Sequence, residues 1–145
     1  MSKVFPFERL VEFCETDAAG IAHFSSLIVY MEQAEHALLR SLGLSVAGLT
    51  TSNPVSNPAT IFTWPRVKVE CDFQSSAKFE DIVSVQTSIA KLGTKSVTFQ
   101  HRLTIGDKQI ASGTMTNVCC THERGSLVGV AIPVPIRELL QPYVV

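Results

Sequence analysis

Asp17 is the carboxylate whose place in the sequence best suits it for chemistry. It lies in the segment 16–21, which reads Thr-Asp-Ala-Ala-Gly-Ile, a few residues before a helical pattern that begins near Phe24. The unpaired N–H groups and the positive dipole end of a helix can stabilise a thioester carbonyl as it becomes an oxyanion. A carboxylate nearby can attack that carbonyl or deprotonate a water molecule. The same local sequence also fits a turn aspartate that binds its own backbone.

Three other side chains are alternative candidates. Glu15 is a second carboxylate, but its place near the end of an expected strand makes it the weaker one. His23 directly precedes the helical pattern, where it could contact a substrate, act as a weak acid or base, or cap the helix. His101 alternates with apolar residues, which is typical of a core or interface histidine.

The sequence does not favour metal chemistry. Its four histidines have no tight spacing, and its four cysteines form no C-x-x-C pair. We therefore predict that no metal is needed, and we expect reduced core cysteines in a reducing compartment. The chain also lacks the G-x-S-x-G elbow and the glycine-rich nucleotide motifs, so a carboxylate at a helix start remains as the catalytic arrangement.

One long helix is expected between Phe24 and Leu42. Its apolar residues recur at spacings of three and four, with Glu35 as the exception, and further apolar residues make its first half apolar nearly all round. Such a helix should be enclosed by protein. Ser25 or Ser26 is a candidate N-cap, and Gly43 is a plausible stop.

The remaining pattern is of strands. Residues 5–13 alternate in polarity, and four further alternating segments follow Pro65, the last of them covering 109–120. Residues 45–60 read as a connection, Gly113 as a bulge or close approach, and Ile136–Leu140 as one helical turn. A single apolar helix and about five antiparallel strands have one compact solution, in which the sheet curls around the helix. We predict an α+β fold.

Length and charge set limits on partners and location. The 145 residues fit one domain covering 1–145, and a net charge of -1 gives no basic excess for binding nucleic acid. Charges interrupt the N-terminus too early for a signal-peptide core, and no apolar run reaches the roughly 18 residues that cross a bilayer. A cytoplasmic protein with neither a membrane nor a nucleic-acid partner is expected.

The stretch 13–25, F-C-E-T-D-A-A-G-I-A-H-F-S, resembles the signature of the 4-hydroxybenzoyl-CoA thioesterase-like branch of hotdog proteins. That signature is an aromatic residue followed by an acidic residue and T-D-x-x-G. The segments 69–81 and 91–96 resemble the family's second strand and its next hairpin, so the similarity spans about residues 5–120. The T-D-x-x-G element is fairly specific, and its position before a helix favours catalysis over a simple turn.

The resemblance implies a hotdog fold, in which a five-stranded antiparallel sheet wraps one long central helix, and hydrolysis of an acyl-CoA thioester to the free acid and coenzyme A. It implies that Asp17 is the nucleophile or general base and that the Phe24 backbone N–H polarises the carbonyl, with His23 as a further catalytic candidate. Coenzyme A is then part of the substrate, and no cofactor is needed. A homodimer or homotetramer with active sites between subunits is also implied. Candidate substrate- or CoA-binding residues are Gly20, Ser25, Lys91, Lys95 and Ser96.

Several functional alternatives remain open. The acyl group is undetermined, because the Thr-Asp-Ala-Ala-Gly-Ile form also resembles thioesterases that act on naphthoyl-type and short aliphatic acyl-CoAs. The acyl group could instead be carried by acyl carrier protein, whose acidic surface would need a basic patch such as Lys91, Lys95 and Arg102. A non-catalytic hotdog domain that binds acyl-CoA is a further alternative, which an intact Asp17 disfavours. Hotdog dehydratases usually carry a catalytic histidine in a different motif.

Overall fold

The computed structural model describes residues 1–46 and 62–145. The connection expected at 45–60 therefore lies, apart from its first two residues, outside the described part. The elements, in chain order, are β1 (Phe5–Leu10), η1 (Phe13–Glu15), α1 (Phe24–Ser41), β2 (Arg66–Phe73), β3 (Ile82–Leu92), β4 (Ser96–Ile105), β5 (Lys108–Val118), β6 (Cys120–Glu123), β7 (Ser126–Gly129), α2 (Val134–Leu140) and η2 (Gln141–Tyr143).

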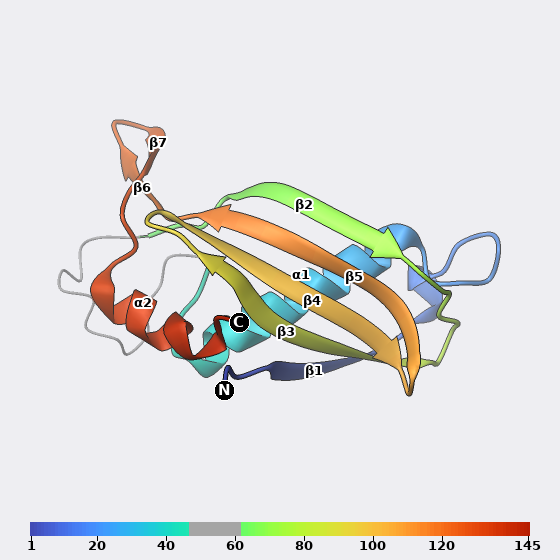
Figure 1. The fold of residues 1–145 in the computed structure, drawn as a ribbon. Coiled ribbons are helices and arrows are strands. Elements are labelled where there is room, and N and C mark those ends of the chain that lie inside the picture. Colours follow the sequence, from blue (N-terminus) through green and yellow to red (C-terminus); the bar gives the residue numbers. More distant parts are fainter. Residues whose placement is uncertain (47–61) are drawn as a thin grey trace.

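Five strands form one antiparallel sheet in the order β1-β3-β4-β5-β2. The sheet curves along α1, which lies against its inner face (Figure 1). Inward side chains alternate with polar outward ones; on β4, for example, Val97, Phe99 and Leu103 are buried. These observations confirm the predicted α+β class, the single long helix and the five-stranded antiparallel sheet.

Helix α1 ends one residue before the predicted limit, and Gly43 follows it with a φ of +76°. The expected serine cap was wrong: His23 is the N-cap, and its side chain accepts a hydrogen bond from the Ser25 N–H. The helix is also less enclosed than its composition indicated. Val29 is 42% exposed, because only one face of the helix meets the sheet. Within the described ranges, no helix is long and apolar enough to cross a membrane.

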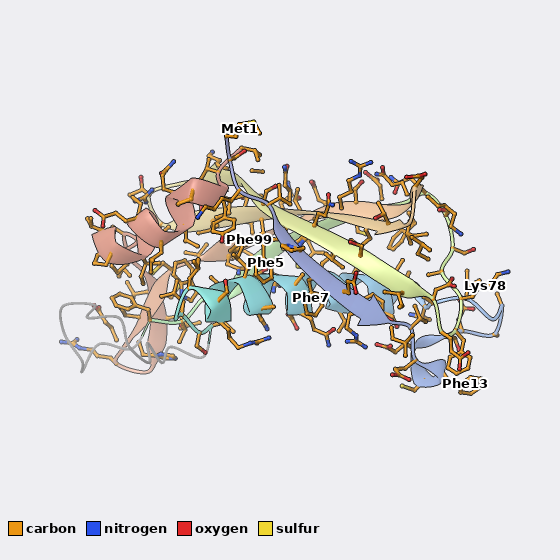
Figure 2. All side chains as sticks on the ribbon, turned by 90° about the horizontal axis from the view of Figure 1, so that it is seen from below. Met1, Phe5, Phe7, Phe13, Lys78 and Phe99 are labelled. Carbon is orange, nitrogen blue, oxygen red and sulfur yellow. The ribbon has the colours of Figure 1, made fainter. Side chains whose placement is uncertain are left out.

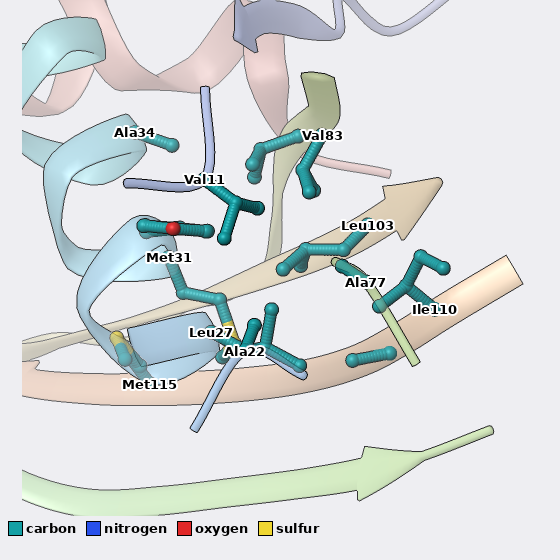
Figure 3. Packing of buried hydrophobic residues seen from close by; sticks show 13 residues of the cluster. Val11, Ala22, Leu27, Met31, Ala34, Ala77, Val83, Leu103, Ile110 and Met115 are labelled. Atoms are coloured by element: carbon teal, nitrogen blue, oxygen red, sulfur yellow. The ribbon is translucent and has the colours of Figure 1, made fainter. Parts of the chain in front are cut away.

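Buried residues form two clusters along α1. The first lies beneath the N-terminal half of the helix, where Met31 packs toward β4 and β5 (Figure 3). The second joins the C-terminal half of α1 to α2 through Leu38, Phe99 and Ile136. Gly113 on β5 makes the close approach that its position indicated, since a Cβ there would lie 2.6 Å from Met31 Cε and 3.2 Å from the Cα of Cys71.

Some elements differ from the sequence-based expectation. The first strand ends at Leu10, and Phe13–Glu15 forms a 3-10 turn beyond the end of β1 (Figure 2). The last predicted strand is interrupted after Val118, and β6 and β7 form a separate hairpin. Cys119 and Cys120 are buried as expected for core cysteines, whereas Cys14 is exposed because it lies in the 3-10 turn.

Candidate active site

Asp17 lies in a tight backbone loop that leads into α1. The loop is closed by the bridge between Thr16 and Ala22 and by a 2.8 Å hydrogen bond from the Asp17 N–H to the carbonyl of Ile21. Gly20 has a φ of +77°, which lets the chain reverse direction there. The 2.8 Å bond from the Ala19 N–H to Asp17 Oδ1 shows that the turn interpretation was partly correct. Oδ2 accepts no hydrogen bond from the described residues, so one oxygen of the carboxylate is anchored and the other is available.

The first turn of α1 carries backbone N–H groups, of which two are bonded by His23. His23 satisfies two of the N–H groups: its Nδ1 accepts from Ser25 at 3.2 Å, and its carbonyl oxygen accepts from Ser26 at 2.8 Å. The N–H of Phe24 finds no acceptor in the part of the chain that the structure covers. Because first-turn N–H groups have no partner inside the helix, that of Phe24 remains free to bind an external oxygen.

A groove of about 310 Å³ brings Asp17 and Phe24 together. One wall comes from the loop and the helix start, and the other comes from the chain that follows β2. The rings of Phe24 and Phe73 meet edge to face at 6.3 Å and are 59% and 48% exposed. The groove is therefore lined by a residue with a free carboxylate oxygen, by a residue with an unpaired N–H and by exposed aromatic rings. Its lining residues are Asp17, Ile21, Ala22, Phe24, Leu27, Phe73, Gln74, Ser75, Ser76 and Ala77.

Sequence reasoning missed the second wall of this groove, residues 73–77. The sequence did show that residues 69–81 resemble a strand and turn of the family. That resemblance did not indicate that residues 73–77 contact the start of α1. A larger hollow of about 480 Å³ lies over polar residues of the outer sheet face and includes neither Asp17 nor a helix start. We therefore assign the site by its chemistry and not by its size.

Glu15, the competing carboxylate, does not line the groove. Both of its oxygens bind Arg9 Nη2, at 3.0 and 2.8 Å, and Oε1 also accepts from the Tyr30 hydroxyl at 2.9 Å. Because the Glu15 carboxylate is bound by Arg9 and by the Tyr30 hydroxyl, it is not available to a substrate in the groove. Asp17 therefore remains the candidate catalytic carboxylate.

The other candidate residues are spread over the fold. Gly20 and Ser25 are exposed beside the loop, but neither lines the groove. Lys91 near the end of β3, Lys95 in the β3–β4 turn and Ser96 at the start of β4 lie at the opposite end of the sheet (Figure 1). The register shows this separation, because Ser96 pairs with Val118 at the end of β5, whereas Phe73 beside the groove pairs with Ala111 near its start. A single chain thus does not bring the β3–β4 turn to Asp17.

His101 is a core histidine, as its alternating context indicated. It is 3% exposed, and its Nδ1 lies 2.9 Å from the Thr87 hydroxyl. Burial, followed by the charge of Arg66, lowers the pKa of His101 from 6.5 to about 3. The described histidines, cysteines and acids form no group of three that could hold a metal ion.

This buried imidazole should make folding pH-dependent. As pH falls through about 6.5, His101 in the unfolded chain takes up a proton, whereas His101 in the folded protein stays neutral. The contribution of His101 to the free energy of unfolding is therefore fully present above that pH and is lost progressively toward pH 3. Between pH 7.5 and 5.5 this histidine should remove about 1.4 kcal/mol of unfolding free energy. Urea unfolding of wild type and His101→Gln at both pH values checks this. An equal pH dependence in the two proteins would contradict it.

Comparison with known proteins identifies the family of the chain. The family model described as Thioesterase superfamily matches residues 19–112, beginning just after Asp17. A 1,4-dihydroxy-2-naphthoyl-CoA hydrolase from Microcystis aeruginosa is 23% identical over 114 residues, which cover 79% of this chain and 78% of the relative.

Solved structures show the same fold. Slr0204, a 1,4-dihydroxy-2-naphthoyl-CoA thioesterase from Synechocystis, superposes with a TM-score of 0.80 at 20% identity, covering 96% of each chain. The gentisyl-coenzyme A thioesterase BH1999 superposes with a TM-score of 0.72 at 28% identity, covering 94% of this chain and 98% of the other. The predicted hotdog fold and thioester-hydrolase class are confirmed, and the chain belongs to the thioesterase superfamily.

Proposed function

We propose that this protein hydrolyses an acyl-CoA thioester to the free acid and coenzyme A, with Asp17 as the catalytic carboxylate. The observation that carries the proposal is the groove in which a free oxygen of Asp17 and the unpaired N–H of Phe24 lie together. The carbonyl oxygen of the thioester binds the Phe24 N–H. As attack turns this oxygen into an oxyanion, the N–H and the helix dipole stabilise the charge.

Asp17 can act by either of two routes. As a nucleophile, Oδ2 attacks the carbonyl carbon, the C–S bond breaks, and the CoA thiolate leaves; water then hydrolyses the acyl-aspartyl anhydride. As a general base, Oδ2 takes a proton from water, which attacks the carbonyl carbon while the thiolate leaves and is protonated. In both routes Phe24 binds the oxyanion. His23 serves mainly to cap the helix that presents this N–H.

The acyl group is proposed to be aromatic. The relatives named above carry the names of naphthoyl-CoA and gentisyl-CoA hydrolases, and the exposed rings of Phe24 and Phe73 offer apolar walls for a planar group. Free-thiol release from a panel of aromatic and aliphatic acyl-CoAs tests the function. Absence of turnover across the panel would contradict it and favour a non-catalytic acyl-CoA-binding domain.

Acyl carrier protein is a weaker alternative donor. Its acidic surface would need a basic patch, yet Arg102 lies on the outer sheet face, farther along β4 from Lys91 and Lys95. Kinetics with the same acyl group on CoA and on the carrier protein separate the two donors. The four free cysteines support a cytoplasmic location, where thiols stay reduced.

We further propose that the active form is a homodimer, or a tetramer built from such dimers. Strand β2 is an edge strand whose Val67 and Val69 are 60% and 42% exposed, which leaves an apolar edge open to pairing. Antiparallel pairing of two β2 strands about a two-fold axis sets the Phe73 end of one against the Arg66 end of the other. The β3–β4 turn of the second copy then reaches the same end of the joined sheet as Asp17.

This arrangement gives Lys91, Lys95 and Ser96 their proposed role. They would bind the phosphates of a CoA molecule whose thioester lies beside Asp17 of the other copy. The proposal therefore accounts for two groups of candidate residues that lie far apart in one chain.

Substitution at this edge should separate the copies. Val69→Lys places a charge where two like strands would meet, so sedimentation at micromolar concentration should shift from dimer to monomer, with loss of most thioesterase activity. Lys68→Gln on the outward face is the control and should remain dimeric. A fully active wild-type monomer would contradict the proposal.

A further inference from the structure

We propose that Glu15, held by Arg9 and Tyr30, is a positioning residue that fixes Asp17 relative to the Phe24 N–H. This role rests on the proposed function of Asp17, because Glu15 would act by fixing the position of the Asp17 carboxylate. Glu15 is two residues from Asp17, and its side chain and its backbone carbonyl bind different elements of the fold.

The carboxylate of Glu15 joins three elements. Arg9 on β1 binds both oxygens, Tyr30 on α1 donates its hydroxyl to Oε1, and the Glu12 N–H donates to the same oxygen at 2.9 Å. The guanidinium of Arg9 also lies 4.7 Å from the centre of the Tyr30 ring and hydrogen-bonds Gln33. A sheet strand, a helix and the 3-10 turn therefore meet at one carboxylate.

The carbonyl of Glu15 binds the beginning of α1. It accepts the His23 N–H at 2.8 Å and the Ser26 hydroxyl at 2.9 Å. His23 is the N-cap, so the residue that precedes the Asp17 loop also orients the turn that presents the Phe24 N–H. A displacement of Glu15 would move the loop and the helix start together.

The protonation states in this cluster favour a structural role and not proton transfer. Burial and the hydrogen bond to Glu15 raise the pKa of Tyr30, so the phenol stays protonated and donates. Tyr30 is fully buried, and the Glu15 side chain is 16% exposed. Hydrogen bonds to a charged partner are stronger than neutral ones, and buried ones hold their geometry tightly. The cluster therefore acts on the reaction only through Asp17 and the helix start.

Two conservative variants test this. Glu15→Gln weakens the bond with Arg9, and Tyr30→Phe removes one hydroxyl while keeping the ring. With benzoyl-CoA as substrate, each should lower kcat about 10- to 100-fold and leave KM within about threefold, since a misplacement of about 1 Å costs up to roughly 10²-fold. The double variant should lose less than the product of the single losses, because both act through one cluster. Glu138→Gln on α2 and Tyr143→Phe on η2 are the controls of the same type and should retain wild-type kcat.

Two readouts separate this role from general structural damage and from the proposed function. Hydrogen exchange of the backbone amides in 17–26 should accelerate in Glu15→Gln and Tyr30→Phe but not in the controls, and this measurement needs no substrate. The pH profile of kcat in both variants should keep the acidic limb of the wild-type profile, because the catalytic carboxylate of Asp17 remains in place. Unchanged kcat in folded Tyr30→Phe, or loss of the acidic limb in Glu15→Gln, would overturn the proposal. Faster exchange without any turnover in wild type would instead count against the proposed function alone.

Discussion

Replacing Asp17 by asparagine should lower thioesterase turnover by about 10²- to 10⁴-fold, the usual range for a lost acid–base group. The substitution keeps the size of the side chain and the oxygen that accepts the Ala19 N–H, so the loop should persist. It removes the charge and basicity of the free oxygen. KM should change little, because the Phe24 N–H and the groove walls remain. Kinetics on an acyl-CoA that the wild type hydrolyses measure both quantities.

The residual rate of Asp17→Asn is itself informative. The helix start should still stabilise the oxyanion, so turnover should stay above that of the uncatalysed reaction. Glu15→Gln is the comparison, and it should cost less because Glu15 supports the site from outside the groove. Near-normal turnover of Asp17→Asn on several acyl-CoAs would assign Asp17 to the turn alone and return the search to Glu15 and His23.

Replacing Arg66 by methionine should destabilise the fold by about 3–5 kcal/mol, the cost of leaving a buried charge without its partner. Arg66 Nη1 lies 2.8 Å from Glu35 Oε2 and 2.9 Å from Asn117 Oδ1, and Glu35 is fully buried on α1. Urea unfolding at pH 7 gives the magnitude. The control is Lys68→Met, whose ion pair with Glu70 is exposed on both sides and should contribute less than about 1 kcal/mol.

The pH dependence of this loss tests its cause. Burial raises the pKa of Glu35, and its bond with Arg66 opposes that rise, so removing Arg66 should raise the pKa further. A carboxyl group whose pKa is higher in the folded than in the unfolded state makes the protein less stable as pH increases. At high pH the unfolded chain releases this proton freely, whereas the folded state must either retain the proton or bury an unpaired charge. Arg66→Met should therefore lose more at pH 8 than at pH 5. The double variant Arg66→Met/Glu35→Leu should recover most of the stability, and an equal loss at both pH values would contradict this account.

The sequence predicted the parts of the fold that follow from periodicity. The α1 segment and the four strands after Pro65 have patterns long enough to show the type of each element and its approximate extent. The β6–β7 hairpin was missed because its two strands, Cys120–Glu123 and Ser126–Gly129, are four residues each, too short for a pattern. The N-cap was misplaced because serine is the commoner capping residue, whereas here His23 adopts the cap conformation and Ser25 already lies in the helix.

The candidate site was predictable only where it is local. Asp17 and Phe24 are close in the sequence, so a motif could indicate both. The wall at residues 73–77 depends on a contact across the sheet, and the Arg9–Glu15–Tyr30 cluster depends on the pairing of β1 with β3 and the packing of α1, which no local pattern encodes. Glu35 interrupts the apolar pattern of α1 because its carboxylate binds Arg66 of β2, a contact that the helix sequence alone does not indicate.

The free edge at β2 has a genetic consequence. In a dimer joined at that edge, each polypeptide supplies Asp17 to one catalytic centre and the β3–β4 turn to the other. A chain that lacks the Asp17 carboxylate and a chain that lacks Lys91 and Lys95 are then each defective in both centres of their own homodimer. When they pair with one another, one centre receives two intact halves while the other receives two damaged ones. Two defective alleles expressed in the same cell would thus complement each other and restore activity.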